Sequence, residues 1–187
     1  MKTFKFAATL GIALTFMATE SCSFSLNGKN IKPSNNYVTK KIELSDISSI
    51  KASTSIDVVY TQTKGESYAE VYAPDNIAPY VKVHQNGDKL EVCYDFPKGL
   101  AVSIRGKYEC EVKVFAPEVT TFTTSSSSDI TLASTLETAK DVNLKTSSSG
   151  DIDAGKIQCS NLNISSSSSG DIAIKSVTCR TLEASAS

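Results

Sequence analysis

The residue with the most definite chemical prediction is Cys22, because a thiol directly after an apolar leader segment can be acylated. Lys2 and Lys5 form a short basic start, and a mostly apolar run follows at residues 6–18. This run is shorter than the roughly 20 apolar residues of a membrane-spanning helix, but it has the length typical of a signal peptide. The sequence therefore predicts a signal peptide at residues 1–21 and a lipid-anchored Cys22. A secreted protein whose first residue happens to be Cys22 is the alternative.

Four aspartates recur at matching positions and offer carboxylate oxygens, which are the ligands that Ca²⁺ prefers. Asp129, Asp151 and Asp171 each precede an isoleucine, and Asp57 precedes a valine. Calcium-binding repeats supply several aspartates per short coil, whereas here there is one per 20–22 residues. We interpret these residues as corner residues whose carboxylates accept local backbone N–H groups, and we expect no metal site. Asp129, Asp151 and Asp171 are the alternative metal ligands.

Two cysteines occupy equivalent positions of the same repeat. Cys159 and Cys179 are 20 residues apart, so stacked coils would bring their Cα atoms to about 4.8 Å. That separation permits a disulfide, but the two side chains would run parallel, so we favour two buried thiols and keep a Cys159–Cys179 disulfide as the alternative. The pair Cys93 and Cys110 is less favoured, because the strand patterns place them on a polar and an apolar face. None of the four has the spacing of a metal site.

No constellation of residues predicts catalysis. His84, the only histidine, lies in an alternating segment before a turn and is expected to be exposed. No Gly-x-Ser-x-Gly motif is present, although serine is abundant. Enzymes built on stacked β coils cleave polysaccharides with clustered carboxylates or cations. Here the repeats offer only isolated cations, namely Lys145, Lys156, Lys175 and Arg180. We therefore expect no enzyme activity and no cofactor.

Composition points to β structure in one exported domain. The chain has 187 residues with 19 basic and 20 acidic side chains, so its net charge of -1 gives no global attraction to nucleic acid or anionic lipid. It contains 28 Ser and 18 Thr but only 9 Gly and 5 Pro, which disfavours a helical bundle. No nucleic-acid partner is expected.

The elements that must position these residues are set by a repeat. The phrases FTTSSSSDI, LKTSSSGDI and ISSSSSGDI occupy residues 122–130, 144–152 and 164–172, and IKASTSIDV at 50–58 is a degenerate copy. Apolar residues flank each serine tract at fixed offsets, which a disordered serine-rich linker has no reason to maintain. A period of 20–22 residues is typical of one coil of a parallel β-solenoid. The final LEASAS at 182–187 starts a coil that is expected to be incomplete, so we expect self-association or fraying through residues 160–187.

The segment at residues 37–118 has alternating apolar and polar residues and no 3.6-residue period, which indicates further strands. VKVHQ and KLEVCYDF flank Asn86-Gly87-Asp88, so we expect a β-hairpin excursion at residues 81–96. The chain is predicted to be all-β.

Taken together, the leader, the Ser55-Ile56-Asp57-Val58 segment, the hairpin and the Ser-Gly-Asp-Ile repeats at 149–152 and 169–172 resemble the head GIN domain family of Bacteroidetes-type bacterial lipoproteins. The resemblance covers about residues 42–187. It implies a right-handed β-helix, an envelope location and the family's label of auto-transporter adhesin.

These observations divide the chain into a signal peptide at 1–21, the anchor cysteine with a polar tether at 22–41, and a β-helix domain at 42–187. We expect an outer-membrane lipoprotein, on the periplasmic or the surface face, that works as an adhesin binding a surface glycan or protein. An envelope carbohydrate-active enzyme, or a structural assembly spacer, is the alternative. Three or more carboxylate or basic residues converging in one cleft would favour the enzyme.

Overall fold

The computed structural model describes residues 28–98 and 101–187. These residues form an all-β structure of seventeen strands in three open sheets, with one 3-10 turn at Ala78–Tyr80 (η1). No helix within the described ranges has the length and apolar character to cross a membrane. The predicted signal peptide at 1–21 and Cys22 lie outside the described residues, as does the first part of the predicted tether.

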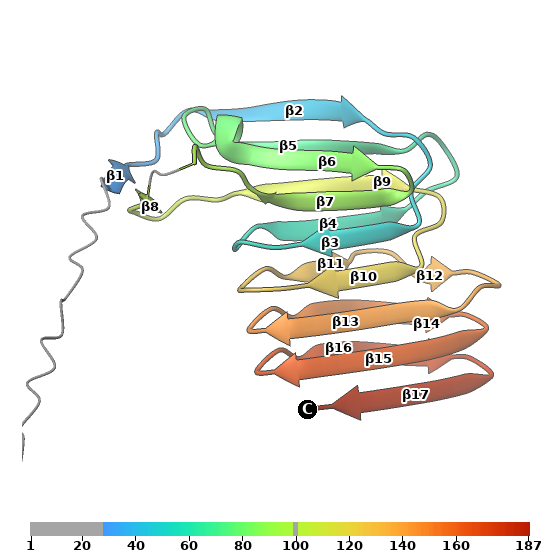
Figure 1. Cartoon of the computed structure of the whole chain (residues 1–187). Coiled ribbons are helices and arrows are strands. Elements are labelled where there is room, and N and C mark those ends of the chain that lie inside the picture. The colour runs from blue at the N-terminus through green and yellow to red at the C-terminus, as the bar shows by residue number, and fades with distance from the viewer. Residues whose placement is uncertain (1–27, 99–100) are drawn as a thin grey trace, which may run out of the picture.

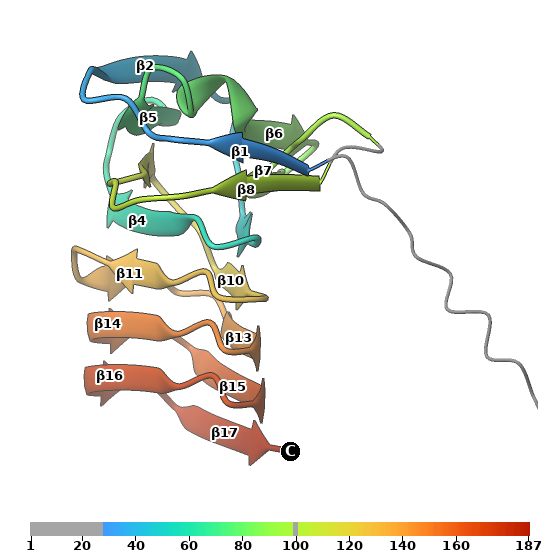
Figure 2. The same ribbon diagram turned by 90° about the vertical axis from the view of Figure 1, so that its left-hand side faces the viewer.

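Two large sheets face each other and run along the length of the molecule (Figures 1 and 2). The seven-stranded sheet contains, in spatial order, β17 (Thr181–Ala186), β15 (Asn161–Ser168), β13 (Val142–Ser148), β10 (Thr121–Thr124), β3 (Ser49–Ala52), β7 (Lys89–Tyr94) and β6 (Val81–Asn86). The eight-stranded sheet contains β12 (Leu136–Glu137), β14 (Ile152–Gln158), β11 (Ile130–Leu132), β4 (Asp57–Gln62), β9 (Glu111–Ala116), β5 (Tyr68–Pro74) and β2 (Tyr37–Glu43), with β16 (Ile172–Thr178) also paired to β14.

The strands of the repeats pair in parallel, at the offsets that the sequence predicts. Phe122 pairs with Leu144, Leu144 pairs with Ile164, and Ile164 pairs with Ala184, so equivalent positions of successive coils lie side by side. On the opposite sheet Ile130 pairs with Ile152 in the same way. Two parallel pairings that flank the same coil join much more distant parts of the chain, because β3 pairs with β10 and places Ile50 opposite Phe122, and β4 pairs with β11 and places Val58 opposite Ile130. The intervening segment builds the other end of the molecule.

The apolar core lies between the two sheets. Inward-facing residues of both sheets are buried, namely Ile50, Phe122, Leu144 and Leu162 from one sheet and Val58, Ile130 and Ile152 from the other. Strands alternate inward and outward side chains, so a single apolar residue every second position is enough to fill this space. The ring of Tyr60 packs against that of Phe122 with centroids 5.2 Å apart. These two aromatic rings therefore fill the core where β4 and β10 lie on facing sheets.

The serine tracts form the tight corner between the two sheets. Ser126, Ser148 and Ser168 occupy the same position of successive coils, and each has a φ between 62° and 69°. Two residues after Ser148, Gly150 passes directly beneath the preceding coil, and a Cβ there would lie less than 3 Å from the Ser128 carbonyl oxygen. The repeated Ser-Ser-Gly-Asp-Ile phrase thus encodes a left-handed turn residue followed by a close backbone approach.

The hairpin expected at residues 81–96 is formed by β6 and β7, which pair antiparallel with His84 opposite Glu91. Gly87 supplies the positive φ of its turn, at 62°. The hairpin is not an excursion, however. β7 also pairs in parallel with β3, with Ile50 opposite Leu90, so the hairpin extends the seven-stranded sheet. Leu90 and Val92, which alternate with polar residues along β7, are buried in the core. The pairing of β7 with β3 could not be predicted from the local sequence.

Candidate functional site

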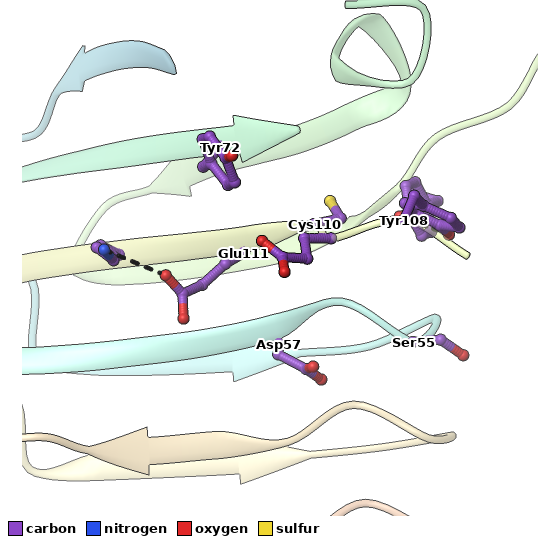
Figure 3. A pocket seen from close by; sticks show the side chains of 9 residues that line it. Ser55, Asp57, Tyr72, Tyr108, Cys110 and Glu111 are labelled. Atoms are coloured by element: carbon purple, nitrogen blue, oxygen red, sulfur yellow. Dashed lines mark hydrogen bonds and ion pairs between the residues drawn. The ribbon is translucent and has the colours of Figure 1, made fainter. Parts of the chain in front are cut away.

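One hollow described by the structure is a trough on the outer face of the eight-stranded sheet, where β4, β9 and β5 lie side by side (Figure 3). Its volume is about 600 Å³. Tyrosines and carboxylates dominate its lining, which consists of Ser55, Asp57, Tyr72, Tyr94, Tyr108, Glu109, Cys110, Glu111 and Lys113. We call this feature the tyrosine trough.

Three of its residues form a line across three neighbouring strands. Asp57 begins β4 and pairs with Glu111 at the start of β9, and Glu111 pairs in turn with Tyr72 on β5. Neighbouring strands lie about 4.8 Å apart, so these three side chains are immediate neighbours on one face. They face outward because the next residues along β4 and β9, Val58 and Val112, are buried in the core. In Figure 3, Glu111 lies between Tyr72 and Asp57.

The aromatic side chains of the trough are held in place by other groups. Tyr72 stacks on Tyr37 of β2, with centroids 4.9 Å apart and an interplanar angle of 21°. The hydroxyl of Tyr37 accepts a hydrogen bond from the Glu109 N–H at 3.1 Å. The Tyr94 and Tyr108 hydroxyls are hydrogen-bonded to each other at 3.1 Å, which joins the end of β7 to the segment before β9. The rings therefore form a fixed surface.

The acidic groups of the trough interact with one another. Partial burial in the trough raises the pKa of Asp57, and the nearby carboxylates of Asp129 and Glu111 raise it further. Glu111 forms an ion pair with Lys113 at 3.4 Å. Burial also raises the pKa of the Cys110 thiol, which disfavours a reactive thiolate. The site thus offers hydrogen-bond acceptors, a carboxyl group that takes up a proton readily, one ammonium group and stacking surfaces.

The sequence analysis identified Asp57 as a corner residue but did not identify the trough. Asp57 and Glu111 lie far apart in the chain, and nothing local in the sequence indicates that β4 and β9 are neighbours. Cys110 was expected on the apolar face of its strand. This expectation is wrong, because β9 begins only at Glu111 and Cys110 instead lines the trough. The outward alternation of Glu109, Glu111 and Lys113 was the one available signal.

The repeated aspartates form a hydrogen-bonded ladder along the corner. The carboxylate of Asp129 accepts the Asp151 N–H at 2.9 Å, and that of Asp151 accepts the Asp171 N–H at 2.8 Å. Asp57 accepts the Asp129 N–H at a longer 3.3 Å. The carboxylates of Asp57, Asp129 and Asp151 thus each accept an N–H of the neighbouring coil, and not the local backbone N–H groups that the sequence interpretation expected. Within the described ranges, no three His, Cys, Asp or Glu side chains gather closely enough to hold a metal ion.

The remaining candidates lie apart from the trough. Cys159 and Cys179 occupy equivalent positions of neighbouring coils, since the Cys159 N–H donates to the carbonyl of Thr178 at 3.0 Å, and both are present as free thiols. Their oxidation to a disulfide stays a prediction. His84 is exposed on β6, as expected. Lys145, Lys156, Lys175 and Arg180 are exposed along the coils and do not meet in one cleft with the trough residues.

A comparison with protein families shows to which family the chain belongs. Residues 46–187 match the family described as "Putative auto-transporter adhesin, head GIN domain". The chain belongs to the head GIN domain family. The resemblance inferred from the repeats is therefore confirmed, and the match covers every strand of the two large sheets except β2. No curated protein sequence matches this head GIN domain chain.

Solved structures support the fold of this head GIN domain chain. It is similar to a "putative lipid binding protein" of Parabacteroides distasonis, with a TM-score of 0.72 and 22% identity over 84% of this chain and 65% of that one. It is also similar to a "putative adhesin" of Bacteroides fragilis, with a TM-score of 0.68 and 22% identity over 83% and 78% of the two chains. A second Parabacteroides distasonis "putative adhesin" gives a TM-score of 0.64 and 19% identity over 84% and 73%. The chain thus spans just under two thirds of the first of these proteins.

Proposed function

We propose that the chain is a non-catalytic cell-envelope protein that binds a surface glycan in the tyrosine trough. One observation carries this proposal, namely the alignment of Asp57, Glu111 and Tyr72 across three strands, with two further tyrosines beside them. Tyrosine rings stack on the apolar faces of sugars, and carboxylates accept hydrogen bonds from sugar hydroxyls. The chain has no Trp, so tyrosine is the side chain available for this role.

The rigidity of the trough supports binding. Tyr72, Tyr94 and Tyr108 are each fixed by stacking or hydrogen bonding, so few rotamers are lost when a ligand is bound. The trough is also open along the outer face of the sheet, which suits a polymer or a branched chain. The family description, that of an auto-transporter adhesin, points to an exported or envelope protein that contacts surface ligands.

A glycan array with matched variants tests this proposal. Tyr72→Ala removes the central ring of the trough. Tyr68→Ala is its control, because Tyr68 lies on the same face of β5 but does not line the trough. The Tyr68 ring stacks instead on that of Phe115, with centroids 4.6 Å apart. We expect wild type and Tyr68→Ala to bind the same glycans, and Tyr72→Ala to lose about 1–3 kcal/mol of binding free energy, as aromatic contacts contribute. An array without signal, with binding to a protein ligand instead, would contradict the glycan assignment.

Polysaccharide cleavage is the second candidate, and a specific observation favours it. Asp57, Glu109 and Glu111 converge with Lys113 in one trough, which is the arrangement that the sequence analysis set as the mark of an enzyme. A carboxyl group with a raised pKa beside an ionised carboxylate can act as an acid and base pair. Release of reducing ends from a polysaccharide panel tests it, with Asp57→Asn and Glu111→Gln as inactive variants and Asp153→Asn, exposed on β14, as control. Absence of release by the wild type would rule out this candidate.

We further propose that the coils follow a right-handed parallel β-helix. The parallel pairing of successive repeats on both sheets supports it, as does the match with the family. A right-handed path is also the strongly preferred hand for parallel strands joined across a layer. An experimental structure in which the chain passes between the sheets with the opposite hand would contradict it.

We propose that Cys22 anchors the chain by lipidation, on the outer membrane. Its support is the sequence of residues 1–22, with a basic start, an apolar run and Ser21 before Cys22. Cys22→Ser is expected to move the protein from the membrane fraction to the soluble fraction. An unchanged distribution, with no added mass at the wild-type N-terminus, would contradict the proposal.

Self-association through residues 160–187, in an assembly or spacer role, is a further proposal. All residues of β17 are exposed, and Leu182 has an exposed fraction of 51%. An exposed strand edge with an apolar residue is a surface to which another strand can add. Light scattering is expected to show association that Leu182→Glu weakens. A strictly monomeric wild type would contradict it.

A further inference from the structure

A small third sheet projects from the side of the stack and carries a concentration of positive charge. β1 (Gly28–Ile31) pairs in parallel with β8 (Ala101–Ile104), away from the two large sheets (Figures 1 and 2). We call residues 28–32, 98 and 101–107 the β1–β8 arm. The arm contains five basic residues and no acidic residue, in a chain where acids outnumber bases. Its cations are Lys29, Lys32, Lys98, Arg105 and Lys107.

These five cations are exposed and have no anionic partner in the described part of the chain. All five are exposed to solvent. The ion pairs among the described residues engage five other lysines, which are Lys41, Lys51, Lys82, Lys113 and Lys140. The carboxylate of Asp75, on the turn that adjoins the arm, accepts the hydroxyl of Ser34 instead. The arm therefore presents uncompensated positive charge.

The arm is fixed to the body of the protein. Ile31 is buried, with an exposed fraction of 7%, and Lys29 Nζ donates to the Tyr80 hydroxyl at 3.4 Å. Arg105 Nε donates to Asn30 Oδ1 at 3.0 Å, which joins the end of β8 to β1. Asn76 Nδ2 donates to the Lys32 carbonyl at 2.8 Å. Lys29, Lys32 and Arg105 are thus held at the two-stranded sheet, and Lys98 and Lys107 lie on the segments that flank β8.

We propose that the β1–β8 arm docks the domain on an anionic phospholipid surface. Charge complementarity supports this occupant, because lysines and arginines beside a membrane are attracted to anionic headgroups. Position supports it too. Gly28 follows Cys22 by six residues, and six residues span at most about 20 Å. The inference deepens the proposed anchoring at Cys22, because one acyl signal is commonly completed by a second, basic one.

Docking of this kind sets the orientation of the domain. With the arm against the headgroups, the body is held to it by the hydrogen bonds of Asn76 and Tyr80. The tyrosine trough lies on the body, outside the arm, and shares none of the five cations. Lipid docking and ligand binding are therefore separable by substitution.

Vesicle co-sedimentation tests the proposal with the full chain carrying Cys22→Ser, which cannot be acylated. The vesicles are phosphatidylcholine alone, or phosphatidylcholine with about a third phosphatidylglycerol. The arm variant Lys32→Gln/Lys98→Gln/Lys107→Gln removes three cations that make no side-chain hydrogen bond among the described residues. The matched control is Lys64→Gln/Lys156→Gln/Lys175→Gln, three exposed lysines of the body with the same loss of charge. A third variant, with arginine at the three arm positions, restores the charge.

We expect binding to the anionic vesicles only, and its loss when the salt concentration is raised to about 1 M. Each cation near the surface contributes about fivefold, so the arm variant should partition about 100-fold more weakly. The control and the arginine variant should bind as the parent does. Unaltered circular dichroism and glycan binding of the arm variant would show that the domain and its trough are intact.

Four results would overturn the proposal. The parent chain could fail to bind anionic vesicles, the arm variant could bind as tightly as the control, or both could bind neutral vesicles equally well. Equal affinity for heparin or DNA would also overturn it, since the arm would then be a general polyanion site. None of these results bears on the trough or on acylation, because the glycan assay and the Cys22→Ser fractionation test those separately.

Discussion

Replacement of Gly150 by alanine tests the corner geometry of the repeat. The usual effect of Gly→Ala in folded structure is a gain of about 0.4–1 kcal/mol, because the unfolded chain loses conformational freedom. At Gly150 the sign should reverse. An added Cβ would lie less than 3 Å from the Ser128 carbonyl oxygen and 3.0 Å from Thr124 Oγ1. The first of these is backbone of the preceding coil, which cannot move without opening the spacing between the coils.

The expected cost follows from this clash. Overpacking of a well-packed interior destabilises by about 1–3 kcal/mol, and here it also strains the hydrogen bond from Thr124 Oγ1 to the Gly150 carbonyl at 3.2 Å. Gly155→Ala is the matched control, because a Cβ at Gly155 meets nothing within 4 Å. The same substitution at this nearby position should leave the free energy of unfolding unchanged or slightly higher.

Urea denaturation followed by circular dichroism measures the difference. We expect Gly150→Ala to unfold at a clearly lower urea concentration than the wild type, and Gly155→Ala at the same concentration or higher. Gly170→Ala should resemble Gly150→Ala in kind, since its Cβ would lie 2.5 Å from the Gly150 carbonyl oxygen. If Gly150→Ala and Gly155→Ala have equal stability, the coils do not stack as closely as the account requires.

Three further substitutions probe the corner, the core and the trough. Ser148→Gly should raise the free energy of unfolding by up to about 1 kcal/mol in urea denaturation, because Ser148 has a φ of 66°; no gain would contradict a left-handed corner. Tyr60→Phe should lower it by about 1–3 kcal/mol, since the buried hydroxyl donates to the Ala116 carbonyl at 3.0 Å and burial raises its pKa to about 12; an unchanged midpoint would refute this. Asp57→Asn should stabilise the protein at neutral pH but not near pH 4, because the raised pKa of Asp57 means that ionisation of this carboxyl group destabilises the folded state. A wild type that becomes more stable relative to the variant between about pH 4 and pH 7 would contradict this prediction.

The parts of the fold that repeat were predictable from the sequence. A fixed offset between equivalent apolar residues leaves one parallel register, and Phe122, Leu144 and Ile164 pair in that register. The Asn-Gly turn at Gly87 likewise determines the β6–β7 hairpin, because the two residues act locally. Both signals are local or periodic, so they can be read without knowledge of the tertiary structure.

The candidate site could not be predicted in this way. Tyr72, Glu111 and Asp57 come together only because β9 inserts between β4 and β5, and these pairings join segments far apart in the chain. No repeat relates these three residues. The alternation of inward and outward side chains on each strand is compatible with several pairing registers. The net charge of -1 concealed the β1–β8 arm for a similar reason, since a total does not record that the segments carrying Lys29 and Arg105 are brought together by the pairing of β1 with β8.

Backbone amide mapping by nuclear magnetic resonance, in a titration with a glycan selected on the array, tests whether the tyrosine trough is the binding site. Binding in the trough predicts that shifts concentrate at residues 55–57, 72, 94 and 108–113, and that Tyr72→Ala strongly reduces them at the same glycan concentration while Tyr68→Ala does not. Shifts along β13, β15 and β17, or an unchanged spectrum at saturating glycan, would contradict the assignment of the tyrosine trough as the binding site.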